Sequence, residues 1–460
     1  MIVGVTGNSG TGKTLICKSI LKNSRYKTVS ILDADKIAKE LSVAGEEYFE
    51  KIVDLFGKEI LTEDGILNRK KLASIIFNNP DKKEELDKIT YKYVGEETKK
   101  RIEQVRYDIV IIDAPLLIES GLNKICNIVI SVIADKNIKL DRICSRDNLS
   151  KKEADNRLNS QKEDEFYILN SNYVIVNNNL NIERQVKDII EFLDSSSYNN
   201  EIVIIQDEDL KILQFKKLLE YKEIKHCYTL KPLDFGSNIT YENKKEEVNS
   251  NYKLVCDYLK LDYKNIVRAF QTHTKNVLKV QNENGIFPKE LLDVDGLITD
   301  KEDKILLLVF ADCTPIFLFD KSKSIIANVH SGWKGTLNKI LLEALNKMIN
   351  ELSCDPKDII CTIGPTIRKC HFEVEEDIKN EFVLSYKEIC NEEEFVEKKN
   401  QGKYLIDTVY LNKKIMLSCG ISEGNIIDSN ICTVCNSNLF HSYRAEKENA
   451  GRSTAIICKQ

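Results

Sequence analysis

The stretch IVGVTGNSGTGKTLICKSILKN, residues 2–23, joins a short β-branched run to a helical pattern through a glycine-rich segment. Its middle satisfies the pattern G-x-x-x-x-G-K-[ST], and the order of strand, loop and helix is typical of phosphate-binding loops. Backbone N–H groups at the start of such a helix point at one spot and cradle an anion. The predicted nucleotide-binding residues are Gly7, Asn8, Ser9, Gly10, Thr11, Gly12, Lys13 and Thr14.

Within this loop we expect Lys13 to reach the transferred phosphoryl group and the Thr14 hydroxyl to bind Mg²⁺. No N-K-x-D motif, which would read a guanine base, occurs in the chain. The loop therefore indicates a kinase that uses ATP with Mg²⁺.

Around the loop, short β-rich runs alternate with helical stretches as far as about residue 193. The runs are IVGVT (2–6), TVSIL (28–32), YDIVIID (107–113), NIVISVIAD (127–135) and YVIV (173–176). Such alternation predicts an α/β fold, in which helices cover a parallel sheet.

A polar segment, DSSSYNN (194–200), follows the last helical pattern and is the predicted linker. It divides the chain into predicted domains 1–197 and 201–460. Beyond it strands recur with fewer helices between them, which predicts a separate mixed α+β domain. The strand-like runs are EIVIIQDE (201–208), KILLLVFADC (304–313), SIIANVH (324–330), DIICTIGP (358–365) and TAIICK (454–459).

Composition excludes several classes of protein. The 460 residues are 30% charged with a net charge of -5, and no block of Lys and Arg indicates a nucleic-acid partner. No apolar run reaches the roughly 18 residues of a transmembrane helix, so no membrane partner is expected. The 14 cysteines without a secretion signal indicate reduced thiols and a cytoplasmic protein.

Two carboxylates end the second predicted strand, in ILDADK (31–36). Ligands bind at the carboxyl edge of a parallel sheet, so Asp33 or Asp35 could orient or deprotonate a hydroxyl nucleophile. The other interpretation is that one of the pair caps the helix that follows.

LDADKIAKEL (32–41), DAPLLIESGL (113–122) and LDRICSRDNLS (140–150), together with the phosphate loop, resemble the dephospho-CoA kinases. The resemblance implies transfer of the γ-phosphate of ATP to the ribose 3′-hydroxyl of dephospho-CoA. It implies Asp35 as the base, and Arg142 and Arg146 as arginines of a helical lid that closes on ATP. The chain differs from the usual family pattern at Tyr91, Lys92, Ser171 and Asn172.

A second set of candidate residues comes from the five histidines of the chain. His273 and His330 follow apolar runs in polar turns, and Cys313 lies in the same kind of setting. Two imidazoles and a thiolate with a fourth position open are how catalytic zinc is held. A cysteine nucleophile with a histidine base would use the same residues, and so would a buried core. The residues alone leave these three interpretations open.

FADCTPIFLF (310–319), VHSGWKG (329–335), IGPTIRKCHFEV (363–374), FHSYR (440–444) and AGR (450–452) resemble the laccase-domain proteins. These proteins, also named polyphenol oxidases, are now regarded as zinc-dependent purine nucleoside phosphorylases. The resemblance implies a Zn²⁺ ion held by His273, Cys313 and His330. It also implies phosphorolysis of adenosine, inosine, guanosine or methylthioadenosine, with adenosine deaminase as a further activity.

The same resemblance places phosphate or ribose contacts at Arg444 and Arg452, and also at Lys231 and Lys334. The family has arginine where these two lysines stand, and a second arginine at Ala445. Lysine cannot make a bidentate contact with phosphate, so weaker activity or a shifted substrate is expected. A multicopper oxidase is excluded, because five histidines are too few for its copper centres.

The pair Cys432 and Cys435, in ICTVC (431–435), is expected to be structural, because no second C-x-x-C completes a zinc ribbon. The sequence thus predicts a bifunctional enzyme whose partners are ATP, dephospho-CoA, purine nucleosides and phosphate. The alternative is another small-molecule P-loop kinase joined to a non-catalytic metal- or nucleoside-binding module.

Overall fold

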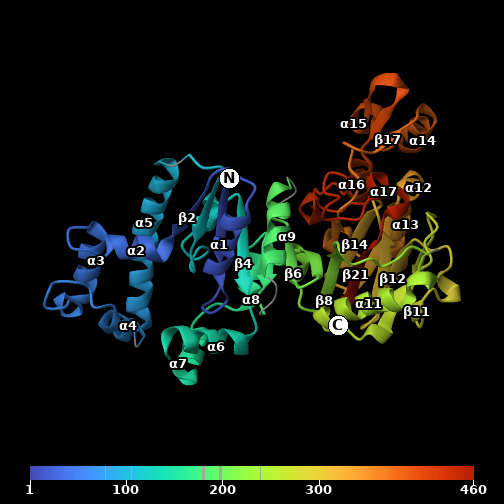
Figure 1. The fold of residues 1–460 in the computed structure, drawn as a ribbon. Helices are drawn as coiled ribbons and strands as arrows, with labels where there is room; N and C mark the ends of the chain where they lie inside the picture. The colour runs from blue at the N-terminus through green and yellow to red at the C-terminus, as the bar shows by residue number, and fades with distance from the viewer. Residues whose placement is uncertain (78, 105, 179–181, 196–198, 239) are drawn as a thin grey trace. The chain divides into compact units, whose positions relative to one another are not determined.

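The computed structural model describes residues 1–77, 79–104, 106–178, 182–195, 199–238 and 240–460. The chain divides into two compact units, Met1–Ile190 and Glu191–Gln460 (Figure 1). Of the predicted linker, residues 196–198 lie outside the described part. Each unit is described by itself.

Unit 1 contains a parallel sheet in the order β5-β4-β1-β3-β2, and every neighbouring pair runs in the same direction. The strands coincide with the β-rich runs of the sequence, so the predicted α/β fold is confirmed. They are β1 (Ile2–Thr6), β2 (Val29–Asp33), β3 (Ile109–Asp113), β4 (Ile128–Ile133) and β5 (Tyr173–Val176).

Helices pack around this sheet and extend beyond it. Figure 1 shows α3 and α4 beside α5, away from the strands, and α6 and α7 as a separate group. The helices are α1 (Lys13–Asn23), α2 (Ala34–Leu41), α3 (Glu47–Phe56), α4 (Arg69–Phe77), α5 (Pro80–Gln104), α6 (Lys136–Asp147), α7 (Lys151–Asn159) and α8 (Asp164–Leu169). Helix α9 (Ile182–Asp194) follows β5 and runs across the boundary between the units.

Both predicted lid arginines, Arg142 and Arg146, lie on α6, which packs against α7. Ser150 and Glu153 form a reciprocal capping box that starts α7, as expected from the spacing S-x-x-E. Ile143 of α6 is fully buried with Ala154 and Leu158 of α7. The two helices therefore share a small apolar core of their own.

Unit 2 is built on two larger sheets. The first has the order β11-β9-β13-β21-β8-β7-β6, and the second has the order β10-β12-β15-β14-β16-β20. Both mix parallel and antiparallel pairs, which confirms the predicted mixed α+β fold. The strands of the first sheet are β6 (Ile202–Asp207), β7 (Leu210–Phe215), β8 (Ile224–Thr229), β9 (Ile266–Arg268), β11 (Gly285–Ile286), β13 (Ile305–Phe310) and β21 (Ser453–Lys459).

The second sheet packs on the first through β15, and buried Asn328 on β15 joins the two. Its amide donates to the backbone carbonyls of Leu306 at 3.1 Å and Ala455 at 2.8 Å, on β13 and β21. The strands of this sheet are β10 (Val277–Lys279), β12 (Gly296–Thr299), β14 (Thr314–Asp320), β15 (Ile325–Ser331), β16 (Ile359–Ile363) and β20 (Ile426–Asp428).

A smaller sheet and several helices complete unit 2. The small sheet, in the order β17-β19-β18, comprises β17 (Glu373–Val374), β18 (Val396–Lys398) and β19 (Tyr404–Ile406). The helices are α10 (Lys216–Leu219), α11 (Lys245–Leu259), α12 (Trp333–Leu337), α13 (Ile340–Asn346), α14 (Glu376–Tyr386), α15 (Glu392–Phe395), α16 (Thr408–Ser418) and α17 (Tyr443–Glu446).

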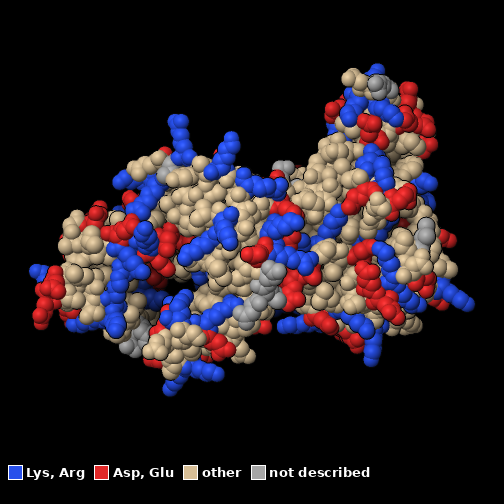
Figure 2. Space-filling model, in the orientation of Figure 1, with Lys and Arg blue, Asp and Glu red and all other residues tan. Residues whose placement is uncertain are grey.

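The surface carries charges of both signs. On the face shown in Figure 2, lysines and arginines are interspersed with aspartates and glutamates over each unit. None of the described helices combines the length and the apolar character that crossing a bilayer requires.

Candidate functional sites

The glycine-rich loop of unit 1 turns sharply between β1 and α1. Gly7 has φ 138°, and a Cβ there would meet the Val132 carbonyl oxygen at 2.1 Å. Gly12, with φ 91°, precedes the first residue of α1. Any other residue would be strained at both positions, so glycine is required for the loop to have this shape.

Lys13 folds back over this loop. Its Nζ donates to the carbonyl oxygens of Gly7 at 2.8 Å and Asn8 at 3.0 Å. Burial lowers the pKa of Lys13, and the carboxylates of Asp113 and Asp35 oppose that shift. The Lys13 ammonium group thus lies at the phosphate loop, within electrostatic reach of the Asp113 and Asp35 carboxylates.

Asp113, at the end of β3, was missed by the sequence analysis. Its Oδ2 accepts a hydrogen bond from the Thr14 hydroxyl at 2.8 Å. Burial raises the pKa of Asp113, and Thr14 and Lys13 counteract part of the increase. A hydroxyl beside a carboxylate suits Mg²⁺, which prefers oxygen ligands. The signal in the sequence was the acid that closes the buried run YDIVIID, at the same sheet edge as Asp33.

The structure separates the roles of the two acids after β2. Asp33 accepts a hydrogen bond from the backbone N–H of Lys36 at 2.9 Å and so caps α2. Asp35 lies exposed in the first turn of α2, where its charge acts on Lys13 and on Arg146. Asp35 is therefore the better placed of the two to meet a substrate hydroxyl.

Both predicted lid arginines line a pocket next to the phosphate loop. Arg142 Nη1 donates to the carbonyl oxygens of Gly10 at 3.2 Å and Asn177 at 3.1 Å. Arg146 forms a two-pronged pair with Asp147, at 2.8 Å for each contact. The pocket, of about 550 Å³, is lined by Gly10, Gly12, Asp141, Arg142, Ser145 and Arg146. The loop and the lid can therefore enclose one anionic ligand.

Other residues of the loop contact the segment that follows the lid. The amide oxygen of Asn8 accepts from the Tyr167 hydroxyl at 2.8 Å, and Ser9 N donates to Gln161 Oε1 at 3.0 Å. The Thr11 carbonyl accepts from the Asn177 amide at 2.7 Å. These contacts hold the loop in position from residues far along the chain.

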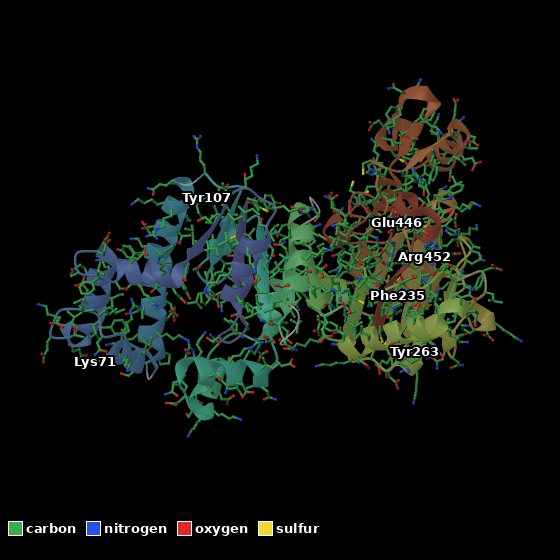
Figure 3. The ribbon with its side chains drawn as sticks, in the orientation of Figure 1. Lys71, Tyr107, Phe235, Tyr263, Glu446 and Arg452 are labelled. Atoms are coloured by element: carbon green, nitrogen blue, oxygen red, sulfur yellow. The ribbon has the colours of Figure 1, made fainter. Side chains whose placement is uncertain are left out.

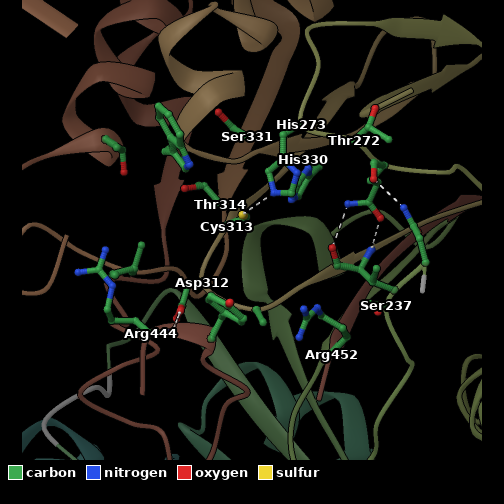
Figure 4. A pocket seen from close by; sticks show the side chains of 18 of the residues that line it. Ser237, Thr272, His273, Asp312, Cys313, Thr314, His330, Ser331, Arg444 and Arg452 are labelled. Atoms are coloured by element: carbon green, nitrogen blue, oxygen red, sulfur yellow. Dashed lines mark hydrogen bonds between the residues drawn. The ribbon is translucent and has the colours of Figure 1, made fainter. Parts of the chain in front are cut away.

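In unit 2 the structure brings His273, Cys313 and His330 together (Figure 4). Cys313 Sγ lies 3.7 Å from His273 Nε2, and one donor atom from each residue lies within 4.8 Å of the others. A Cβ at Gly332 would stand 2.8 Å from the His273 ring and 3.1 Å from Cys313 Sγ. Glycine at this position therefore leaves room for the cluster.

Asp295 supports this cluster from behind and was also missed by the sequence analysis. It is fully buried, and its Oδ1 lies 2.8 Å from His330 Nδ1. The backbone N–H groups of His273 and Thr274 donate to the same carboxylate at 3.1 and 2.7 Å. Burial opposes ionisation, but the hydrogen bonds from His330 and Thr274 outweigh it and lower the pKa of Asp295. A carboxylate on one ring nitrogen fixes the other nitrogen as a metal ligand.

Cys313 lies among groups that favour its thiolate form. Burial opposes ionisation of the thiol, but the neighbouring His330 and His273 outweigh it and lower the pKa of Cys313 to about 6. The thiolate is the form that binds metals. Two imidazoles and one thiolate, converging within 4.8 Å, fit a borderline-soft divalent ion with an open position.

The cluster opens into a pocket of about 660 Å³ that also contains Arg444 and Arg452. The Arg444 guanidinium donates to the His371 carbonyl at 2.8 Å, and its backbone N–H donates to Asp312 Oδ2 at 2.6 Å. Trp333 lines the pocket as well. A cavity of this size, with arginines opposite the cluster (Figure 4), suits a small anionic or aromatic ligand.

Arg452 is fixed by its backbone. Its N–H donates to Asp234 Oδ1 at 2.8 Å, and its carbonyl accepts from Phe235 N at 2.9 Å. Figure 3 labels Phe235 and Arg452 within unit 2. Its guanidinium contacts the carbonyl oxygens of Ala450 and Gly451 at 2.8 and 2.9 Å. The guanidinium is therefore held at the wall of the pocket by backbone carbonyl oxygens.

Lys231 and Lys334 do not line this pocket. Lys231 Nζ contacts Glu446 Oε1 at 2.5 Å and the Ser437 carbonyl at 2.6 Å. Lys334 is exposed, with its Nζ 5.4 Å from the centre of the Trp333 ring. The structure thus brings the two predicted arginines to the cluster but leaves the two predicted lysines outside it.

We expect Asp295→Asn to weaken metal binding at this cluster by about 10–100-fold, because the carboxylate that orients His330 is lost. Metal affinity is measured by competition with a chelator of known affinity. Asp300→Asn is the matched control, since Asp300 pairs with Lys279 at 2.7 Å, away from the cluster. Equal affinities of the two variants would contradict the role given to Asp295.

The two sites define the class of protein. Unit 1 has a fold of the P-loop class, and unit 2 carries a candidate metal centre in a pocket. Comparison with known families agrees with this division: residues 1–183 match the family described as dephospho-CoA kinase, and residues 229–460 match the family described as multi-copper polyphenol oxidoreductase laccase.

Individual relatives match each part over nearly their whole length. A dephospho-CoA kinase of Fusobacterium nucleatum is 35% identical over 195 residues, which are 42% of this chain and 98% of the relative. A purine nucleoside phosphorylase of Clostridium acetobutylicum is 31% identical over 260 residues, which are 55% of this chain and 100% of the relative. The chain therefore belongs to the dephospho-CoA kinase family in its N-terminal part and to the laccase-domain family in its C-terminal part, which confirms both resemblances.

A solved structure agrees with the second assignment. The Bacillus licheniformis hypothetical protein YfiH is 27% identical and superposes with a TM-score of 0.51. The match covers 56% of this chain and 99% of that protein.

Proposed function

We propose that this protein is a bifunctional cytoplasmic enzyme with a dephospho-CoA kinase domain, residues 1–197, and a purine nucleoside phosphorylase domain, residues 201–460. For the first activity the main support is the placement of Lys13. It lies in the phosphate cradle with Asp35 and Asp113 close enough to act on its charge. For the second it is the cluster of His273, Cys313 and His330 at the wall of a pocket that contains two arginines.

In the kinase reaction the ribose 3′-oxygen of dephospho-CoA attacks the γ-phosphorus of ATP, and the bond to the ADP oxygen breaks. Asp35 takes the proton of the hydroxyl. Lys13 and the lid residues Arg142 and Arg146 stabilise negative charge on the transferring group. Thr14 and Asp113 would hold Mg²⁺, whose charge would offset that of the phosphate oxygens.

In the phosphorolysis reaction a phosphate oxygen attacks the anomeric carbon, and the bond to the purine nitrogen breaks. Arg444 and Arg452 would bind the phosphate or ribose, because fixed guanidinium groups suit anions. A zinc ion held by His273, Cys313 and His330 would supply Lewis-acid chemistry at the pocket wall. Zinc fits better than copper, because a blue-copper site usually adds an axial methionine and both Met348 and Met416 lie in the apolar core.

The proposal is tested with purified full-length protein. CoA formation is measured from ATP with dephospho-CoA and, for comparison, with nucleosides as acceptors. Release of free base is measured on a panel of purine nucleosides with phosphate present and absent. If the protein phosphorylates nucleosides or other acceptors but not dephospho-CoA, its first domain is a different small-molecule kinase. Base release that does not depend on phosphate would contradict phosphorolysis, and release of ammonia from adenosine would reveal a deaminase.

We expect Arg452→Ala to raise KM for phosphate by about tenfold or more, since a hydrogen bond to a charged group contributes about 1.5–3 kcal/mol. Lys334→Ala is the comparison variant, because the exposed Lys334 does not line the pocket. We expect it to change KM for phosphate by less than about twofold, as is usual for an exposed charge. A larger effect of Lys334→Ala than of Arg452→Ala would indicate that phosphate binds near Lys334 and not near Arg452.

A further inference from the structure

A second group of thiols and imidazole lies in unit 2, between the loops that follow β16 and β20. Thr366 and Cys432 form a parallel bridge, in which Thr366 N donates to the Ile431 carbonyl at 3.2 Å and Thr433 N donates to the Thr366 carbonyl at 3.0 Å. The two loops therefore run side by side. They bring Cys370 and His371 next to Cys432 and Cys435, although Cys370 and Cys432 are 62 positions apart.

The spacing of the donor atoms matches a tetrahedral site. Zinc binds sulfur at about 2.3 Å and nitrogen at about 2.0–2.1 Å, so tetrahedral ligands stand about 3.8 Å apart for two sulfurs and about 3.5 Å apart for sulfur and nitrogen. Cys370 Sγ lies 3.6 Å from Cys432 Sγ and 3.8 Å from Cys435 Sγ. His371 Nδ1 lies 3.2, 3.6 and 3.5 Å from the sulfurs of Cys370, Cys432 and Cys435.

We propose that Cys370, His371, Cys432 and Cys435 hold a structural zinc ion, which is distinct from any ion held by His273, Cys313 and His330. Four protein ligands leave no position open for a substrate, and such closed sites are structural. The sulfurs are too far apart for a disulfide, whose S–S bond is about 2.05 Å. The proposal does not depend on the reaction at the His273 cluster.

The site would stabilise one wall of the large pocket. The carbonyl of His371 accepts from the Arg444 guanidinium at 2.8 Å. The hydroxyl of Thr433, next to Cys432, donates to Asp312 Oδ1 at 2.6 Å, and Asp312 Oδ2 accepts from Arg444 N at 2.6 Å. Joining the two loops through zinc therefore positions Arg444 and Asp312 without contact between the ion and a substrate.

The first test counts metal ions in full-length protein purified without a histidine tag. We expect Cys435→Ser to lose about one zinc per chain relative to the unsubstituted protein, because loss of one thiolate ligand weakens zinc binding at this tetrahedral site. Cys313→Ser should lose the other ion, and the double variant should lose both. Cys419→Ser is the matched control, since Cys419 is a partly buried cysteine of the same unit that belongs to neither cluster. Unchanged zinc content in Cys435→Ser would overturn the proposal, whatever activities the protein has.

The second test needs no substitution. Cys370 and Cys435 are exposed, so an alkylating reagent would reach both thiols unless they bind metal. We expect iodoacetamide to label them slowly in the zinc-loaded protein and at least about tenfold faster after chelation, as followed by peptide mass spectrometry. The labelling rate of Cys419 reports general unfolding. Equal rates with and without the chelator, or a disulfide within the cluster, would refute zinc binding there.

Discussion

Lys13→Ala should abolish CoA formation and leave nucleoside phosphorolysis unchanged. The substitution removes the ammonium group that bridges the Gly7 and Asn8 carbonyls and faces Asp113. Because this charge stabilises the transferring phosphoryl group inside the loop, we expect the rate of CoA formation to fall by about 10³-fold or more. The rate is measured as CoA formed from ATP and dephospho-CoA, beside base release from adenosine in the same preparation.

Lys18→Ala is the matched control for this prediction. Lys18 is an exposed lysine on the same helix, α1, and its removal should leave both activities unchanged. Loss of both activities in Lys13→Ala would contradict two independent sites. Retention of CoA formation would show that the phosphate loop does not serve that reaction.

Cys313→Ala should lose the ion of the His273 cluster, and phosphorolysis with it. Removal of the thiolate leaves two imidazoles, which cannot hold zinc as three ligands do. We expect the zinc content to fall by about one ion per chain, and not to zero if the Cys370 cluster also binds zinc. Metal content is determined by elemental analysis on the preparation used for the nucleoside assay.

Two observations would argue against this assignment. Full zinc occupancy in Cys313→Ala would remove Cys313 from the ligand set. Phosphorolysis that survives loss of the ion would favour catalysis by the arginines alone. CoA formation serves as the internal control, because Lys13 and Asp35 belong to the other unit and should be unaffected.

Local patterns were sufficient for much of the fold. The five strands of the parallel sheet coincide with β-rich runs of the sequence, because strand periodicity is a property of neighbouring residues. The phosphate loop coincides with its glycine pattern, because positive φ angles at Gly7, Gly10 and Gly12 depend on the residue type at each position. The S-x-x-E spacing that starts α7 is local in the same way. The candidate zinc ligands needed more than spacing: the residues alone grouped His273, Cys313 and His330 but left a zinc site, a cysteine nucleophile and a buried core open, and the resemblance favoured zinc.

The residues that support these sites could not be found in this way. Asp113 meets Thr14 across 99 positions and Asp295 meets His330 across 35, through contacts set by the order of strands in each sheet. Cys432 and Cys435 were noted in the sequence, but without Cys370 and His371, which approach them only because two loops run side by side.

The sequence by itself therefore determined the two fold classes, the phosphate loop and the family memberships, because each is carried by contiguous motifs. Only the tertiary structure decided which carboxylate caps a helix and which faces the loop, and which cations line the pocket. Only the tertiary structure showed that the four candidate metal ligands Cys370, His371, Cys432 and Cys435 lie together, because their approach depends on packing between distant segments.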